Sequence, residues 1–375
     1  MRLSSCCSAA CGFVISALLC AAPVVCAQAQ AAPENDKPWT ATSQTSGAGG
    51  PLRTTESHTK SGNLNVDKQT VEVQGPDGRY QPYLDTETET VQVNATTIRK
   101  IVRTYGRDSD GRRNLTQVTE DESQSSANGD AKVVRTTSNP DLNGGLQLVQ
   151  REVSDTRKTG PNTEETKTTV YMPQSGSMAA VQQTVESQRH TGGGNVDVKK
   201  TTLLPDGNGE FQVGEVRENT IREEGKNRTS EERVSHPDSE GRLSEVSRTV
   251  GKETESAAGE KNNTVETYST DAPGLAPDGS LHLNQRVTTV QKKDSSGKTT
   301  EQQVEQPNSG DPNAGLQVST KTKYIVLYGA SGTQQTKTIQ AHDINGTFNV
   351  VSVETKKSDQ APAAQVQIAP SDKPK

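Results

Sequence analysis

The residues best suited to chemistry are Asp and Asn clusters that recur between apolar stretches. Asp108-Ser109-Asp110-Gly111 and Asp206-Gly207-Asn208-Gly209 resemble the front of an oxygen-ligand loop for calcium. Neither continues with the Glu that supplies a bidentate ligand at the twelfth position of such loops. The same residue types also favour tight turns, because Asp accepts local backbone hydrogen bonds and Gly takes a positive φ. We therefore expect turns here, with calcium binding as the alternative.

Other side chains with catalytic potential are scattered. The five histidines (His58, His190, His236, His282 and His342) stand at different positions relative to the turns, so no partners converge on them. The carboxylate pairs Glu223-Glu224 and Glu231-Glu232 read as solvated strand residues. The chain has no P-loop, no H-E-x-x-H and no G-x-S-x-G motif. The sequence predicts no catalytic, cofactor-binding or metal-ligating residue, and an enzyme with an unrecognised site is the remote alternative.

The N-terminus has the pattern of an export signal. Arg2 supplies a positive charge, Ala9–Val25 is apolar and rich in small residues, and Ala27-Gln28-Ala29 forms a cleavage site. We therefore predict a signal peptide at 1–29. A retained membrane anchor and acylation at Cys20 or Cys26 are the alternatives. All five cysteines lie in this segment: Cys6, Cys7, Cys11, Cys20 and Cys26. The mature chain then has no disulfide and no thiol chemistry, and no later segment is apolar enough to span a membrane as a helix.

Composition favours strands and argues against nucleic-acid binding. Hydrophobic residues make up 28% and aromatic residues 3% of the chain, and the net charge is −6. Nucleic-acid binding calls for a basic stripe with stacking aromatics, which this chain lacks. The low apolar content raises disorder as an alternative. However, Val and Thr are abundant and the net charge is small, which favours β-structure.

A turn-and-strand pattern recurs about every 32 residues. The first apolar residues after successive Pro/Asp/Gly turns are Leu52, Tyr80, Leu115, Leu146, Met178, Phe211, Leu243, Leu281, Leu316 and Phe348. A second turn rich in Gly and Asn comes half a unit later, so each unit reads as one β-hairpin. We predict an all-β fold, an elongated antiparallel meander of hairpin repeats in a single curled or folded-over sheet. The expected regions are a signal peptide (1–29), a flexible linker (30–49), a β-hairpin repeat array (50–357) and a disordered tail (358–375).

Apolar residues gather beside the Pro/Asp turns, and the far half of each hairpin is polar. In the unit 237–270, Leu243, Val246, Val250, Val265 and Tyr268 read as the part that must be buried. Stacked hairpins would align these residues as one apolar band, covered by curling of the sheet or by a partner. A transmembrane barrel would need an apolar face and aromatic girdles. We do not expect one, because Lys, Glu and Arg occupy both strand faces.

The segment Gly241-Arg242-Leu243 resembles the G-R-L core of bacterial YD-type wall repeats, without the Tyr-Asp pair of that family. The overall style is similar to exported bacterial repeat proteins. We therefore expect a non-enzymatic bacterial protein of the periplasm, cell surface or extracellular space, with a structural or scaffold role. The alternative is an adhesin-like module that binds polysaccharide or protein. Expected partners are a second copy of the chain or an envelope polysaccharide or protein, with no cofactor and no nucleic acid.

Overall fold

The computed structural model describes residues 38–47, 50–108, 110–256, 258–271, 279–308, 311–329, 332–342 and 347–358. All of them belong to one compact unit, Asp36–Lys375. The signal peptide expected at 1–29 lies outside the described residues, as does the expected tail after residue 358. In the described part of the chain, no helix is long and apolar enough to cross a membrane.

The described part of this unit contains twenty strands. In chain order they are β1 (Trp39–Gly47), β2 (Leu52–Ser61), β3 (Leu64–Gln74), β4 (Tyr80–Gln92), β5 (Thr97–Arg107), β6 (Arg113–Ser125), β7 (Ala131–Pro140), β8 (Leu146–Gly160), β9 (Thr163–Gln174), β10 (Ser177–Gly192), β11 (Asn195–Pro205), β12 (Phe211–Glu224), β13 (Asn227–Pro237), β14 (Leu243–Glu255), β15 (Lys261–Ser269), β16 (His282–Lys293), β17 (Gly297–Asn308), β18 (Asp311–Gly329), β19 (Gly332–His342) and β20 (Phe348–Ser358). The prediction of an all-β chain is confirmed.

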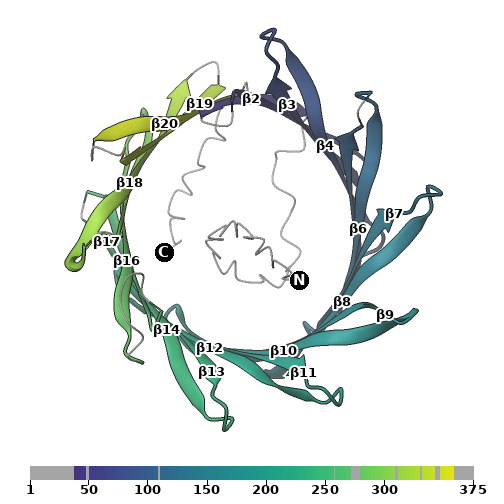
Figure 1. Ribbon diagram of the computed structural model, residues 1–375, viewed down its shortest axis with the longest axis vertical. Coiled ribbons are helices and arrows are strands. Elements are labelled where there is room, and N and C mark those ends of the chain that lie inside the picture. The colour runs from purple at the N-terminus through teal and green to yellow at the C-terminus, as the bar shows by residue number, and fades with distance from the viewer. Residues whose placement is uncertain are drawn as a thin grey trace, which may run out of the picture. The chain divides into compact units, whose positions relative to one another are not determined.

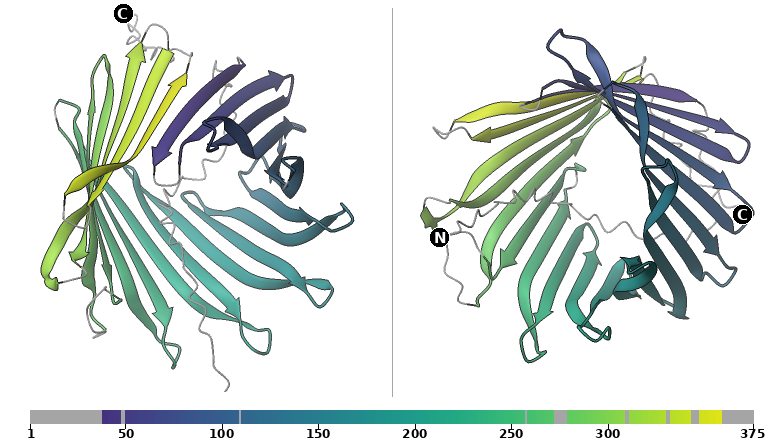
Figure 2. Two further views of the ribbon diagram at one scale, coloured as in Figure 1. Left: turned by 45° about the horizontal axis from the view of Figure 1, so that its top comes forward. Right: turned by 45° about the vertical axis from the view of Figure 1, so that its right-hand side comes forward.

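The strands close into a barrel. Each strand pairs antiparallel with the next one along the chain. The ring is completed by β1, which pairs with β20 from Ala41↔Ser358 to Gly47↔Ser352. Figure 1 shows the ring viewed down its axis, and Figure 2 shows the purple β1 beside the yellow β20. None of the described strands has an unpaired edge, which removes the sites where β-proteins aggregate edge to edge.

Closure corrects two expectations from the sequence. The open, elongated meander is wrong, because the sheet is a closed 20-stranded ring. The cause lies in the stretch 30–49, which was expected to be a flexible linker. Its residues Trp39–Gly47 form β1, the strand that bonds both β2 and β20. Residues 30–37 and 48–49 of that stretch lie outside the described residues.

The strand registers set the size of the barrel. A path that follows the hydrogen-bonded pairs from β1 round the ring returns to β1 about 20 residues further along the strand. For 20 strands, this stagger tilts the strands by roughly 35° from the barrel axis and gives a ring radius of roughly 19 Å. Described side chains on opposite walls therefore cannot touch across the ring. The wall is a single layer, without the packed interior that fills an eight-stranded barrel.

The registers also identify the inner face, because barrel strands coil in a right-handed sense. As strand number increases, the path of hydrogen-bonded pairs moves toward the C-terminal ends of the odd-numbered strands. Consider an observer outside the barrel who sees the even-numbered strands run upward. For this observer the path moves downward, and with the right-handed tilt this means that strand number increases to the right. On a strand that runs upward, an L-residue whose side chain faces the observer directs its own N–H to the right. On β14, Glu255 donates its N–H to Lys226, on the β13 side and to the left. Glu255 and the residues that share its face therefore point inward.

Turn chemistry explains where the strands end. At the Pro/Asp turns the carboxylate of one Asp accepts two loop N–H groups. In the turn before β12, Asp206 Oδ1 accepts the N–H of Asn208 at 2.8 Å and that of Glu210 at 2.9 Å. In the turn before β14, Asp238 Oδ1 does the same for Glu240 and Arg242. Gly241 takes a φ of 78°, which a side chain would strain. Most even-numbered strands begin at or next to the apolar residues that define the predicted period, whereas β6 and β18 begin two and five residues before theirs.

Very little of the described chain is buried. The buried apolar residues in the described ranges are Ala41, Val216, Val234 and Val326, and the buried charged residue is Asp85. The described residues therefore form no extended hydrophobic core. The stability of the barrel must come from the closed backbone ladder and from cross-strand side-chain pairs, each of which contributes about 0.2–1 kcal/mol.

Candidate functional site

The outer face carries an apolar belt beside the Pro/Asp turns. The belt is defined here by residues that share the outer face near that rim: Tyr80, Tyr105, Leu115, Leu146, Leu148, Tyr171, Met178, Leu203, Phe211, Val213, Leu243, Tyr268, Leu283, Leu316, Val318, Phe348 and Val350. These residues run from β4 to β20 and encircle most of the ring. They correspond to the apolar band that the sequence predicts at this end of the hairpins.

The chain itself does not bury the belt. None of its residues is buried in the unit. Leu146, Leu243 and Val350 are 56%, 52% and 54% exposed. Of the two expected ways to cover Leu243, cover by curling of the sheet is therefore not observed, and cover by a partner stays a prediction. A single-layer wall has no second sheet to pack on its outer face, so these side chains remain in contact with solvent or with a partner. Exposed apolar residues that form a continuous patch mark interaction sites.

The belt is too narrow to face a lipid bilayer across its thickness. It occupies about two outward positions on each strand, or roughly 7 Å. A membrane barrel presents an apolar band about 25 Å tall. Beyond the belt, the described outer face carries ion pairs, including Lys199–Glu218 at 3.0 Å and Arg286–Glu266 at 2.9 Å. The geometry suits contact with a partner at one rim.

A compact polar cluster interrupts the belt on β3 to β6. The Asp85 carboxylate, whose side chain is 11% exposed, lies 2.5 Å from Arg107 and 3.1 Å from Arg113. It also accepts a hydrogen bond from Thr70 at 2.9 Å. The Arg113 guanidinium stacks 3.5 Å from the centroid of the Tyr105 ring. The guanidinium groups of Arg107 and Arg113 both pair with the Asp85 carboxylate, so the cluster links four strands. Its members are engaged with one another, and none of them is placed to act as a nucleophile.

Sequence reasoning did not find this cluster, because its members come from four strands. Asp85, Arg107 and Arg113 meet only through the β4–β5 and β5–β6 registers. A local signal did exist for the belt. Leu146 and Leu148, like Phe211 and Val213, stand two residues apart at the start of an even-numbered strand, the spacing of one strand face.

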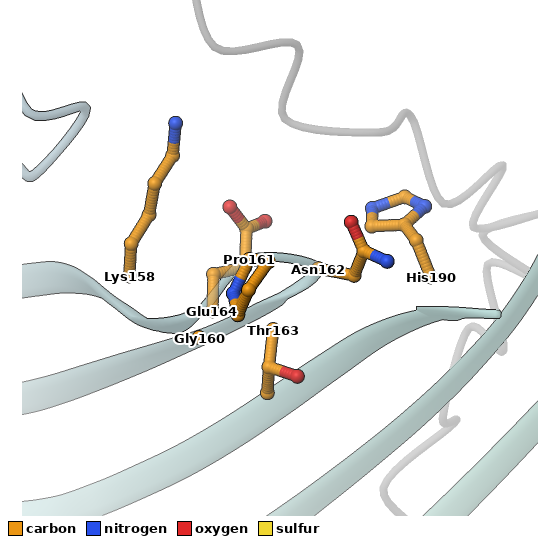
Figure 3. Close-up of a pocket in the computed structure, with 7 residues that line it drawn as sticks. All are labelled: Lys158, Gly160, Pro161, Asn162, Thr163, Glu164 and His190. Atoms are coloured by element: carbon orange, nitrogen blue, oxygen red, sulfur yellow. The ribbon is translucent and has the colours of Figure 1, made fainter. Parts of the chain in front are cut away.

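Figure 3 shows a shallow pocket at the turn between β8 and β9. Its volume is about 230 Å³, and it is lined by Lys158, Gly160, Pro161, Asn162, Thr163, Glu164 and His190. The side chains of Lys158, Glu164 and His190 rise from one side of the hairpin, and that of Thr163 points to the other side. The His190 ring lies 3.0 Å from the Gln188 amide nitrogen. No hydroxyl or thiol is hydrogen-bonded to His190 in the described ranges, so the pocket holds no nucleophile–base pair.

The remaining histidines take up separate places. His58 Nδ1 lies 2.6 Å from Asp67 Oδ1, and its ring stacks on Trp39 with centroids 6.2 Å apart. His236 contacts Glu215 at 3.4 Å, and His342 packs edge-on against Phe348. Within the part of the chain that the structure describes, no three His, Cys, Asp or Glu side chains form a cluster that could hold a metal.

The Asp-rich turns have their oxygen atoms engaged. Asp108 Oδ1 accepts the N–H groups of Asp110 and Arg112, at 2.9 Å and 2.8 Å. The second oxygen of Asp108 lies 3.3 Å from the amide nitrogen of Asn114. This arrangement explains the Asp as the residue that organises the turn. The carboxylates Glu223 and Glu224 point to opposite faces of β12, as do Glu231 and Glu232 of β13, so neither pair acts as a unit.

Comparisons with known proteins are limited. No protein-family model and no curated protein matches the chain. Among solved structures, a porin-like protein from Bacteroides uniformis is 13% identical, over 73% of this chain and 95% of that one, with a TM-score of 0.12. Transferrin binding protein B from Haemophilus parasuis is 9% identical, over 86% and 75%, with a TM-score of 0.14. The beta domain of a Bordetella autotransporter is 7% identical, over 86% and 98%, also with a TM-score of 0.14. At these TM-scores the likenesses carry no weight in the assignment of function.

Proposed function

We propose that this chain is an exported, non-enzymatic barrel of the bacterial cell envelope that acts as a scaffold through its apolar belt. The observation that carries the proposal is the belt itself, a series of apolar residues, half-buried or exposed, on the outer face of most of the ring at one rim. The export pattern at the N-terminus supports the location. The scattered histidines and the engaged carboxylates of the described residues support a role without catalysis.

The belt favours a partner that meets the barrel from outside. Leu and Tyr dominate it, and aromatic residues such as Tyr contribute strongly when a partner covers them. The Pro/Asp turns lie at the same rim and carry charges, for example on Asp238 and Arg242. An apolar strip bordered by charged groups has the composition of a protein interface, with an apolar centre and a polar rim.

The test compares belt and control variants of the mature chain. The variant Leu146→Gln/Leu243→Gln/Val350→Gln replaces three exposed belt residues. The control Val93→Gln/Leu327→Gln replaces residues of similar exposure, 54% and 49%, near the opposite rim. Sedimentation velocity measures self-association, and co-sedimentation with purified envelope fractions measures binding of other partners. Circular dichroism confirms that each variant is folded.

We expect the belt variant to lose self-association or envelope binding, and the control to retain it. If the wild-type barrel neither associates nor binds envelope material, the scaffold role is wrong. Equal losses in the belt and control variants would also contradict it, because the belt would then have no special part.

A further inference from the structure

The inner face at the same rim has a different composition from the belt. Amide side chains gather there within a few residues of the Pro/Asp turns. This amide collar consists of Gln81, Asn114, Gln117, Asn139, Gln147, Gln150, Gln174, Gln182, Gln212, Gln285, Gln306, Gln317 and Asn349. Its members come from strands β4 to β20, so the amides recur round most of the ring.

The collar is nearly free of charge. The ionisable residues on the inner face at this level are Glu215, His236 and His282, and the first two contact each other. Further from the rim the inner face becomes charged. Arg135 there pairs with Asp121 at 2.7 Å, and Arg217 with Glu232 at 3.4 Å. The change from amides to ion pairs along one face separates the collar from the rest of the wall.

Several collar amides are available to a ligand. Gln117, Gln147, Gln150, Gln182 and Gln285 make no side-chain hydrogen bond within the described part of the chain, and none of them is buried. Others are engaged, since Gln212 donates to Asp206 at 3.0 Å and Asn114 to Asp108 at 3.3 Å. Each free amide offers two N–H donors and one carbonyl acceptor.

We infer that the amide collar binds a neutral polysaccharide. A sugar hydroxyl both donates and accepts hydrogen bonds, and an amide can satisfy both roles without a charge that needs a counter-ion. The free amides of β6, β8 and β10 lie on every second strand, about 10 Å apart, so one extended chain can meet them in succession. Each contact is weak on its own, and binding gains strength from their number. The collar and the belt lie on opposite faces of the sheet, so this inference does not depend on the scaffold role.

Affinity electrophoresis of the mature chain tests the inference. The probes are the neutral polymers dextran and hydroxyethylcellulose, with dextran sulfate as the charged comparison. The collar variant is Gln147→Glu/Gln182→Glu, which keeps the side-chain size and adds two charges. The matched control is Gln188→Glu/Gln291→Glu, on the same face near the opposite rim. A second variant, Gln150→Ala/Gln182→Ala, removes amides without adding charge.

We expect at least one neutral polymer to retard the wild-type barrel. Both collar variants should bind it about fivefold more weakly, with no change for the control. Three results would overturn the inference: no retardation by either neutral polymer, stronger retardation by dextran sulfate, or equal losses in collar and control variants. The belt variant has an intact collar and should bind the neutral polymer like the wild type, so the two proposals fail independently.

Discussion

At the residue scale, the most firmly held side chain is Asp85. It is a buried charge in a barrel with few buried groups of any kind, and its partners Arg107, Arg113 and Thr70 come from three other strands. Removing one member of such a group leaves the others with an unmet charge. Asp85 therefore connects the registers of β3 to β6, and its loss should be felt beyond its own strand.

We expect Asp85→Asn to lower the free energy of unfolding by about 1–3 kcal/mol, because two guanidinium groups lose their carboxylate. Urea denaturation followed by circular dichroism measures the change. Asp155→Asn is the control, since Asp155 also lies on the outer face but forms no ion pair in the described part of the chain. If Asp85→Asn lowered the free energy of unfolding no more than Asp155→Asn does, the stabilising role of the cluster would be contradicted.

Acid should destabilise the barrel through its paired glutamates. The hydrogen bond from Arg53 lowers the pKa of Glu72, and the hydrogen bond from Arg248 lowers the pKa of Glu245. A carboxylate whose pKa is lower in the folded state stabilises that state fully above its unfolded pKa of about 4.3. That contribution is lost as the pH falls below 4.3 and through the folded pKa. We expect a constant melting temperature from about pH 7 to pH 5 and a decline below that.

The variant Arg53→Gln/Arg248→Gln removes the partners of both glutamates. Its melting temperature should decline less between about pH 5 and pH 3 than that of the wild type. Differential scanning fluorimetry across this range measures both curves. Parallel curves for wild type and variant would show that these two ion pairs do not link stability to pH.

At the element scale, the sequence predicts the hairpins well but not their closure. Pro, Asp and Gly mark most turns, and Val and Thr mark the strands between them. Strand β1 carries only part of the strand signal, because the stretch 39–47 (WTATSQTSG) has three Thr residues but lacks Val, Leu and Ile. Its extended state depends on β2 and β20, which supply hydrogen-bond partners on both sides. Partners that lie far away in the sequence leave no local pattern, so the ring could not be predicted.

A disulfide across the seam tests closure directly. Gln44 on β1 faces Thr355 on β20 in register, and directly paired residues have Cβ atoms about 4.5–5.5 Å apart. The chain has no cysteine after Cys26, so Gln44→Cys/Thr355→Cys should form a single new disulfide under mild oxidation. Mass spectrometry of the digested protein identifies it.

The control pair moves one strand further round the ring. Thr336 on β19 pairs with Thr355, so Gln44→Cys/Thr336→Cys places the sulfurs two strands apart, beyond the reach of a disulfide. This pair should remain reduced. An open sheet would predict no disulfide in either variant, and equal yields in both would indicate a disordered seam.

At the scale of the whole molecule, the barrel has a large surface and hardly any core. A wide single-layer ring cannot cover both of its faces, and the buried apolar residues in the described ranges are few. The composition anticipates this result, since the hydrophobic fraction is 28%. What the composition could not show is that the outer face at one rim carries the apolar belt, while the inner face there mixes amides with apolar residues such as Met172 and Leu204. That division depends on which face of each strand points outward, which in turn depends on the registers.

We expect the heat capacity of unfolding to be low for a chain of this length. Unfolding of typical globular proteins raises the heat capacity by about 12–15 cal/mol/K per residue, mainly because apolar surface becomes exposed. Much of the apolar surface of this barrel is already in water, so the value should fall below that range. Scanning calorimetry of the mature chain gives the number. A value within the usual range would point to apolar burial that the described residues do not have.

The seam also has a consequence for biosynthesis. Its ion pair joins Lys356 of β20 to Glu56 of β2, across β1, and spans 300 positions of the chain. Contacts between such distant residues slow folding, because a long loop must close before they form. During translation β1 exposes one unpaired edge until β20 has left the ribosome, and exposed edges favour aggregation. A nascent chain that stalls before Phe348 would therefore have to be kept apart from its neighbours, which makes holding chaperones part of the cost of building a closed ring.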